Sequence, residues 1–175
     1  MTYSSDWFLE QARLGNMFHS CSTGAVTLST VSATCTGLVL SNPIGSGKNL
    51  VVEKCRFAPS TAPAGAAVVG LAISPAVQAT EVVHTTPAVI HNAITTGSNA
   101  NVGVAKVDAA ATLGAAPVWL RPIGGVVAAS SISPGMYVDE TKGDIILPPG
   151  TNLSFSYLTT AAVGIAAFSW AEVPV

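Results

Sequence analysis

The sequence predicts an all-β domain, a single jelly-roll or Greek-key β-sandwich that follows an N-terminal arm. From Gly24 onward, short apolar runs are separated by Gly, Pro, Asn and Ser at intervals of about ten residues, which is typical of sandwiches and barrels. The chain has 175 residues, a length that suits one domain. Charged residues make up only 9% of the sequence, against roughly 25% in an ordinary soluble domain. We therefore expect one core and a surface covered mainly by small polar side chains.

Residues 1–24 are expected to form the arm and residues 25–175 the sandwich. Ser5 can cap one or two helical turns, and Gly15 then breaks the helical pattern. Four large apolar side chains of this segment cannot bury one another in so short a stretch, so we expect them to contact a partner: Trp7, Phe8, Leu14 and Phe18. The sandwich is expected to fold without the arm.

The strands are expected between successive turn signals, at residues 26–28, 36–40, 49–57, 68–74, 88–93, 102–108, 118–122, 145–147, 152–159 and 163–170. In the third of these, Val51, Glu53, Cys55 and Phe57 alternate with Leu50, Val52, Lys54 and Arg56. One set should therefore face the core and the other the solvent. Pro148, Pro149 and Gly150 predict a turn between two extended runs.

Charge and hydropathy argue against two classes of partner. The net charge is −2, and the Lys and Arg residues are scattered along the chain, so we expect no direct contact with nucleic acid. No apolar stretch reaches the ~20 residues that a membrane-spanning helix needs, and the first ten residues do not look like a secretory signal. We expect a protein made in the cytoplasm, with Cys21, Cys35 and Cys55 as free thiols.

The segment 42–49, Asn-Pro-Ile-Gly-Ser-Gly-Lys-Asn, has some likeness to a phosphate-binding loop. Such a loop needs Gly at the place of Asn42, Ser or Thr at the place of Asn49, and a helix after it. A strand pattern follows instead. The segment therefore predicts a turn that connects two strands.

The remaining polar residues do not form a convincing catalytic or metal site. The three histidines, His19, His84 and His91, lack a second ligand at helical or strand spacing. The acidic group Asp139, Glu140 and Asp144 offers fewer oxygens than calcium requires and fits a solvated turn. No Ser or Cys is expected to have a His placed to act as its base, and no Gly-x-Ser-x-Gly motif occurs. We expect a protein that is not an enzyme and uses no metal and no other cofactor.

Three parts of the chain resemble tailed-bacteriophage virion proteins of the cement or decoration type. They are residues 13–18 (RLGNMF), residues 36–50 (TGLVLSNPIGSGKNL), and residues 145–151 (IILPPGT) together with 168–174 (FSWAEVP). The resemblance implies a jelly-roll protein on the outer surface of the capsid, where it binds the major capsid protein and stabilises the head. The low charge favours self-association as a homodimer or homotrimer.

A tail- or fibre-associated module that binds a receptor or glycan is the alternative. Sugar sites usually present exposed Trp or Tyr side chains, whereas Trp119 and Trp170 lie in apolar strand patterns that indicate the core. An enzyme of the cupin type ranks third, because it would need a cluster of histidines.

Overall fold

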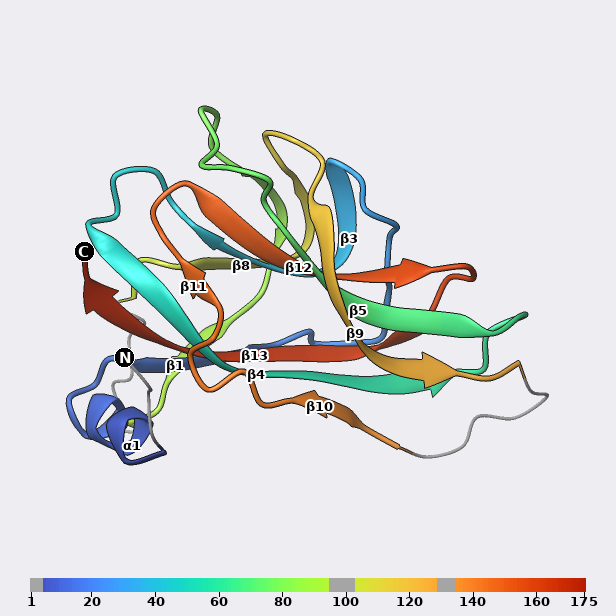
Figure 1. Ribbon diagram of the computed structural model, residues 1–175, viewed down its shortest axis with the longest axis horizontal. Helices are drawn as coiled ribbons and strands as arrows, with labels where there is room; N and C mark the ends of the chain where they lie inside the picture. The colour runs from blue at the N-terminus through green and yellow to red at the C-terminus, as the bar shows by residue number, and fades with distance from the viewer. Residues whose placement is uncertain (1–4, 95–102, 129–134) are drawn as a thin grey trace.

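Two antiparallel sheets pack face to face, and one short helix lies at the end of the molecule that also carries the C-terminus (Figure 1). The computed structural model describes residues 5–94, 103–128 and 135–175. Sheet A contains, in spatial order, β10 (Tyr137–Asp139), β4 (Lys48–Thr61), β13 (Val163–Pro174), β1 (Met17–Cys21) and β7 (Ile90–Asn92), with β11 (Ile146–Leu147) on β4 and β2 (Val26–Thr27) on β13. Sheet B contains β6 (Val83–Pro87), β8 (Lys106–Thr112), β3 (Thr34–Asn42), β12 (Thr151–Leu158), β5 (Ala67–Ile73) and β9 (Val118–Val126). The helix α1 spans Ser5–Arg13.

The all-β sandwich predicted from the sequence is confirmed. The chain passes from one sheet to the other between β3, β4 and β5 and again between β11, β12 and β13, as it does in double-sheet jelly rolls. Every predicted strand overlaps an observed one, although Val102 of the segment 102–108 lies outside the described residues. The short strands β1, β6 and β10 were not predicted, because three to five residues of mixed polarity give no clear period.

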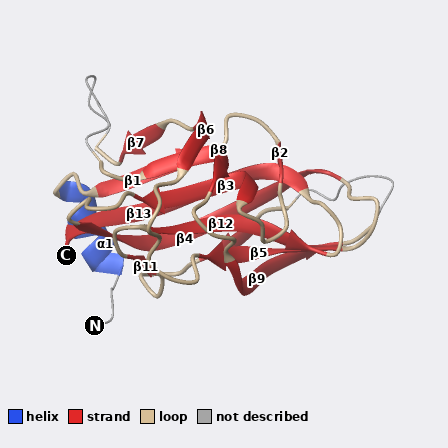
Figure 2. Ribbon diagram, turned by 90° about the horizontal axis from the view of Figure 1, so that it is seen from above, coloured by secondary structure: helices blue, strands red, loops and turns tan. Residues whose placement is uncertain are grey.

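The expected boundary between arm and sandwich is corrected by β1. This strand pairs with β13 on one side and β7 on the other, so it lies inside sheet A (Figure 2). Gly15, with a φ of 76°, ends the helical region, and the backbone N–H of Glu172 donates to the carbonyl of Asn16 just before the strand begins. The sandwich therefore begins at Met17 and not at residue 25. Residues 1–4 of the expected arm lie outside the described residues.

Aromatic side chains from both sheets fill the core. Phe18 stacks on Trp170 with ring centroids 6.0 Å apart, and both side chains are almost fully buried. Phe155 of sheet B lies 4.8 Å from Phe168 and 6.2 Å from Phe57 of sheet A. Trp170 therefore occupies the core as the sequence predicts, while Phe18 is a core residue and not part of the expected N-terminal arm.

A β-bulge corrects the alternation expected for residues 49–57. Ser169 pairs with Lys54 and Trp170 pairs with Val52, so Glu53 is the extra residue in β4. The bulge reverses the facing of the strand: Leu50 and Val52 face the core before it, and Cys55 and Phe57 face the core after it. The turn at residues 141–145 stabilises this irregular backbone, because Thr141 Oγ1 donates to the carbonyl of Val52 over 2.6 Å and the N–H of Lys142 donates to that of Glu53 over 3.0 Å.

The turns at 42–49 and 148–150 are confirmed, and one side chain connects them. Asn42 Nδ2 donates to the carbonyls of Lys48, over 2.7 Å, and Leu147, over 2.8 Å. Ser46 Oγ donates to Asn42 Oδ1 over 2.7 Å, which fixes the orientation of the amide. Gly150 completes the second turn with a φ of 80°. The motif with some likeness to a phosphate-binding loop is thus a strand connection, held by its own asparagine.

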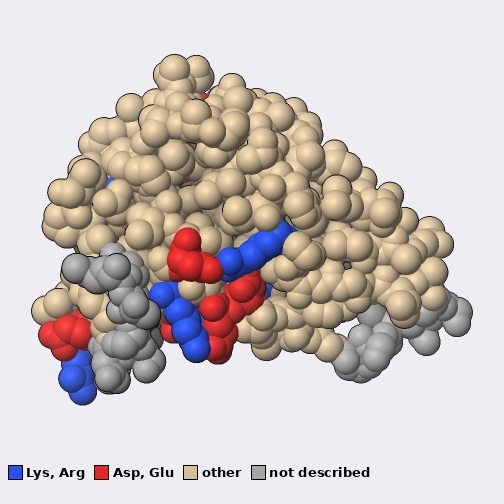
Figure 3. All heavy atoms as spheres, in the orientation of Figure 1, with Lys and Arg blue, Asp and Glu red and all other residues tan. Residues whose placement is uncertain are grey.

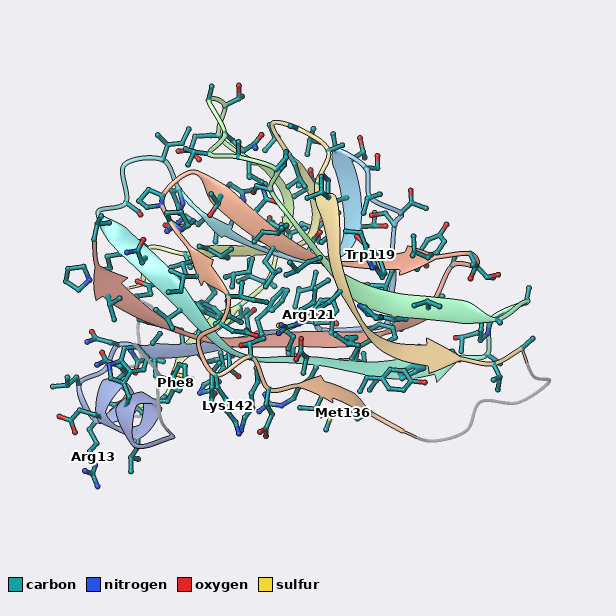
Figure 4. The ribbon with its side chains drawn as sticks, viewed as in Figure 1. Phe8, Arg13, Trp119, Arg121, Met136 and Lys142 are labelled. Atoms are coloured by element: carbon teal, nitrogen blue, oxygen red, sulfur yellow. The ribbon has the colours of Figure 1, made fainter. Side chains whose placement is uncertain are left out.

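Charged side chains on the face shown in Figure 3 gather where β9 and β10 close one edge of the sandwich and around α1. Arg121 of β9 donates through Nε to Asp139, over 2.8 Å, and through both Nη atoms to Asp144, over 2.7 and 3.2 Å. Tyr137 Oη donates to the carbonyl of Gly125 over 2.6 Å. Figure 4 shows Arg121 between the layers at this edge. The acidic turn 139–144 is therefore held by a guanidinium.

Trp119 departs from its expected place in the core. Its ring lies on the outer face of sheet B over Gly70, where an added Cβ would come within 2.6 Å of the ring, and the side chain is only half-buried.

Cys35 and Cys55 are buried, Cys21 is exposed, and all three are free. Within the described ranges, α1 is the only helix, and it is too short and too polar to cross a membrane.

Candidate functional site

The outer face of sheet A brings together polar side chains that are far apart in the sequence. Strand pairing places Lys54 of β4, Ser169 of β13, His19 of β1 and His91 of β7 in one row across four neighbouring strands (Figure 2). Along β1, Phe18 and Ser20 are buried, so His19 between them points outward. The row therefore follows from sheet register and not from any local motif.

Hydrogen bonds link three members of this face. Arg56 Nη1 donates to Ser169 Oγ over 3.2 Å, and Ser169 Oγ lies 2.9 Å from His19 Nδ1. Ser169 is fully buried, and its hydroxyl hydrogen has no other acceptor among the described residues. The hydroxyl therefore donates to His19 Nδ1, which leaves the ring proton of the neutral imidazole on Nε2. His19 Nε2–H is then a donor that the sheet itself does not use.

The surroundings of His19 favour its neutral form. Burial lowers the pKa of His19 below 6.5, and the positive charge of Arg56 and the neighbouring His91 lower it further. The carboxylate of Glu53 acts in the opposite direction but is outweighed by burial. At neutral pH this imidazole is therefore uncharged and presents a fixed hydrogen-bond donor.

Arg56 differs from most of the charged residues around it. Lys54 lies 3.6 Å from Glu53 and 3.7 Å from Glu140, so its charge is compensated. Among the side chains that the structure describes, no carboxylate forms an ion pair with the half-buried Arg56, and its single hydrogen bond goes to Ser169. A guanidinium has five N–H donors in a planar fork, so most of its donors remain available.

Two hollows flank His19 on this face. The first, which we call the Arg56 hollow, has a volume of about 240 Å³ and is lined mainly by His19, Cys21, Arg56 and His91 over a floor of Ala167 and Phe168. The second, the α1 hollow, has a volume of about 270 Å³ and lies between α1 and the sheet, lined by Phe8, Leu9, Ala12, Met17, His19, Glu53 and Ala93. Since His19 lines both, the hollows are neighbouring parts of one surface.

The structure separates the four residues that were expected to bind a partner. Phe8, which Figure 4 shows between α1 and the sheet, is 5% exposed and packs with Met17, Val51 and Ala171. Trp7 is half-buried against the same cluster, with its ring edge-on to Phe8 at 4.9 Å. These two side chains attach α1 to the sheet.

Of the other two expected partner contacts, only one can reach a partner. Leu14 is 60% exposed at the end of α1. Phe18 is 2% exposed inside the sandwich, because it falls on the inward side of β1. The prediction of Phe18 as a partner contact is therefore wrong.

The structure also brings together His84 and Asp108, a contact that the sequence analysis did not predict. His84 Nδ1 lies 2.6 Å from Asp108 Oδ2 beside a hollow of about 330 Å³ at the β6 edge of sheet B. Asp108 is fully buried, and its other carboxylate oxygen has no hydrogen-bond partner among the described residues. The residues 24 positions apart meet because β6 pairs with β8. Among the residues described, no group of three or more His, Cys, Asp or Glu side chains is placed to hold a metal ion.

No protein-family model matches this chain, and no curated protein sequence matches it. The site is therefore argued from its geometry alone.

Proposed function

We propose that this chain is a non-enzymatic structural protein of a tailed-phage virion, a cement or decoration protein that binds the major capsid protein on the outside of the head. The outer face of sheet A carries this proposal. It presents two exposed apolar side chains, Leu9 on α1 (51% exposed) and Leu14 just after the helix (60% exposed), and the α1 hollow that Leu9 lines adjoins the cationic Arg56 hollow at His19. Apolar contacts supply the affinity of a protein interface, and an uncompensated guanidinium supplies its specificity.

The placement of the three segments that resemble cement proteins supports the proposal. Residues 13–18 lead into β1, which pairs with residues 167–171 of β13, and β13 pairs in turn with residues 48–61 of β4. The amide of Asn42 binds the carbonyl of Leu147, which joins the segment 36–50 to the segment 145–151. Segments that are remote in sequence thus contact one another in the folded sandwich.

Self-association as a homodimer or homotrimer is part of the same proposal. Among the described strands, β9 pairs only with β5, and it exposes Val118 and Leu120; Val138 on β10 and Met136 just before it are also exposed. An unpaired edge with apolar side chains is a natural site of contact between copies. Sedimentation at micromolar concentration should give a species larger than the 17.6 kDa chain. A lone monomer would contradict self-association.

Copy number in purified particles tests the proposal most directly. A protein inventory of virions by mass spectrometry should find this chain in amounts close to those of the major capsid protein. Heads stripped of the protein should bind it again and resist heating better when they do. Absence from particles, or an amount typical of a tail protein, would contradict the proposal.

One observation supports the alternative function, a glycan-binding module of the tail. It is the exposed part of the Trp119 side chain. The indole lies half-buried on an outer sheet face, the kind of platform on which a sugar ring stacks. Titration of the protein with glycans of the host surface, followed by tryptophan fluorescence, separates the two functions. A saturable change that is lost in Trp119→Ala would favour the alternative.

A further inference from the structure

Among the described residues that line the Arg56 hollow, hydrogen-bond donors are in excess and no carboxylate is present. Arg56 uses one donor, the Nη1–H to Ser169, and His19 presents its Nε2–H. His91, exposed on the neighbouring strand, lines the third side. The carboxylate of Glu53 lines the other hollow and lies 3.6 Å from Lys54 Nζ.

Arg121 shows what a saturated guanidinium looks like in the same fold. It binds Asp144 through two nitrogens and Asp139 through a third. Arg56 is similarly half-buried, but within the part of the chain that the structure describes its only partner is a neutral hydroxyl. A half-buried charge without a counter-charge costs free energy that a bound anion would recover.

We infer that the Arg56 hollow binds the carboxylate of an Asp or Glu side chain on the capsid partner, with the guanidinium as a planar fork and His19 Nε2–H as a further donor. This inference rests on the proposed function, because that function makes the ligand a protein. The shape of the donors fits a carboxylate, which accepts two parallel N–H bonds from Arg. Because His19 lines both hollows, one segment can place its acidic side chain in the Arg56 hollow and an apolar side chain beside Leu9 in the α1 hollow.

The first experiment tests the hollow in the isolated full-length protein. N-acetyl-glutamate α-amide, which carries only the side-chain carboxylate, is titrated while NMR follows the Arg56 Nε–H and the His19 ring. We expect saturable shifts at both groups, and none with N-acetyl-glutamine amide. Arg56→Gln should weaken binding by about tenfold or more. Lys106→Gln, which removes an exposed cation from sheet B, should change it less than about twofold.

Three outcomes of this titration would overturn the inference. They are the absence of saturable shifts in the wild-type protein, equal binding of the glutamine derivative, and binding that survives in Arg56→Gln. Inorganic phosphate serves as the second arm. If it displaces the glutamate derivative and binds more tightly, the hollow is a phosphate site and not a carboxylate site.

The second experiment uses stripped heads and separates this inference from the proposed function. Wild-type protein and Lys106→Gln should decorate the heads equally, whereas Arg56→Gln should lose about tenfold or more in affinity and Arg56→Lys should lose less. If Arg56→Gln decorates heads normally, the cement function stands and the carboxylate site fails. If the glutamate derivative binds at Arg56 but the wild-type protein does not bind to stripped heads, the site stands and the cement function fails. The urea midpoint of each variant shows whether a loss comes from unfolding, and the titration of wild-type protein decides the question if Arg56→Gln does not fold.

Discussion

The helix α1 and the strand β1 follow each other in the chain but belong to different parts of the molecule. α1 lies on the outer face of sheet A and is attached through Phe8 and the half-buried Trp7. β1 lies inside the sheet, hydrogen-bonded on both sides, and inserts Phe18 into the core against Trp170. Large apolar side chains within eleven residues of each other therefore have unrelated roles. The backbone environment, and not hydrophobicity, decides which of them holds the fold and which is open to a partner.

Two truncations test this difference between α1 and β1, and they should have the largest effects on stability. Removing residues 1–18 takes Met17 and Phe18 out of β1 and opens sheet A between β13 and β7. The loss of a buried Phe alone costs about 3–5 kcal/mol, a large part of the roughly 5–15 kcal/mol that stabilises a domain. We expect no cooperative unfolding. Removing residues 1–13 should retain the β-type circular dichroism spectrum and a cooperative transition at lower temperature. If both truncations melt alike, β1 is not essential.

A point substitution gives the same contrast in the full-length chain. Phe18→Ala should lower the free energy of unfolding by about 3–5 kcal/mol, because the surrounding core cannot collapse into the cavity. Urea denaturation measures this value. A loss below about 1 kcal/mol would mean that Phe18 is not held in the core.

Phe8→Ala should cost less, at most about 1.5–3 kcal/mol. Its cluster lies under α1 at the surface, so the helix can detach while the sandwich stays folded. Amide hydrogen exchange should show faster exchange in residues 5–13 and unchanged protection in β1. Faster exchange throughout β1 would show that helix and strand unfold as one unit.

The pH dependence of the unfolding free energy should report on His19, which lies on the outward side of β1. The pKa of His19 is lowered in the folded protein, so above pH 6.5 the ring is neutral in both the folded and the unfolded state. As the pH falls below 6.5, the unfolded chain takes up a proton before the folded one does, and stability is lost until the folded pKa is passed. The fall in unfolding free energy from about pH 7.5 to about pH 5 should therefore be smaller in His19→Gln than in the wild type. An equal fall in both proteins would contradict the lowered pKa.

Leu14→Ala should have the smallest effect on stability. The side chain is 60% exposed, and such surface substitutions usually stay within about 0.5 kcal/mol. Its expected effect is on binding to stripped heads, which should weaken while the urea midpoint stays unchanged. A clear shift of the midpoint would place Leu14 among the residues that hold the fold.

Local sequence determined the strands and turns of this protein. Pro148, Pro149 and Gly150 can form only a turn, and the runs at 49–57 and 163–170 have the length and composition of strands wherever they are placed. These features depend on neighbouring residues, so they can be read without knowing which strands pair. The all-β class followed from their regular spacing.

The tertiary structure alone decided the faces and the candidate site. The alternation in β4 reverses at the Glu53 bulge, which depends on a turn some ninety residues later in the chain. No local motif marks the polar residues of the candidate site. They meet because β4, β13, β1 and β7 are neighbours in one register, and they are His19, Arg56, His91 and Ser169. The five residues of β1 are too few to show a clear strand period, so the sequence alone places Phe18 in the arm. Strand pairing is a long-range contact, set by the packing of the whole sandwich, so no local stretch of sequence contains it.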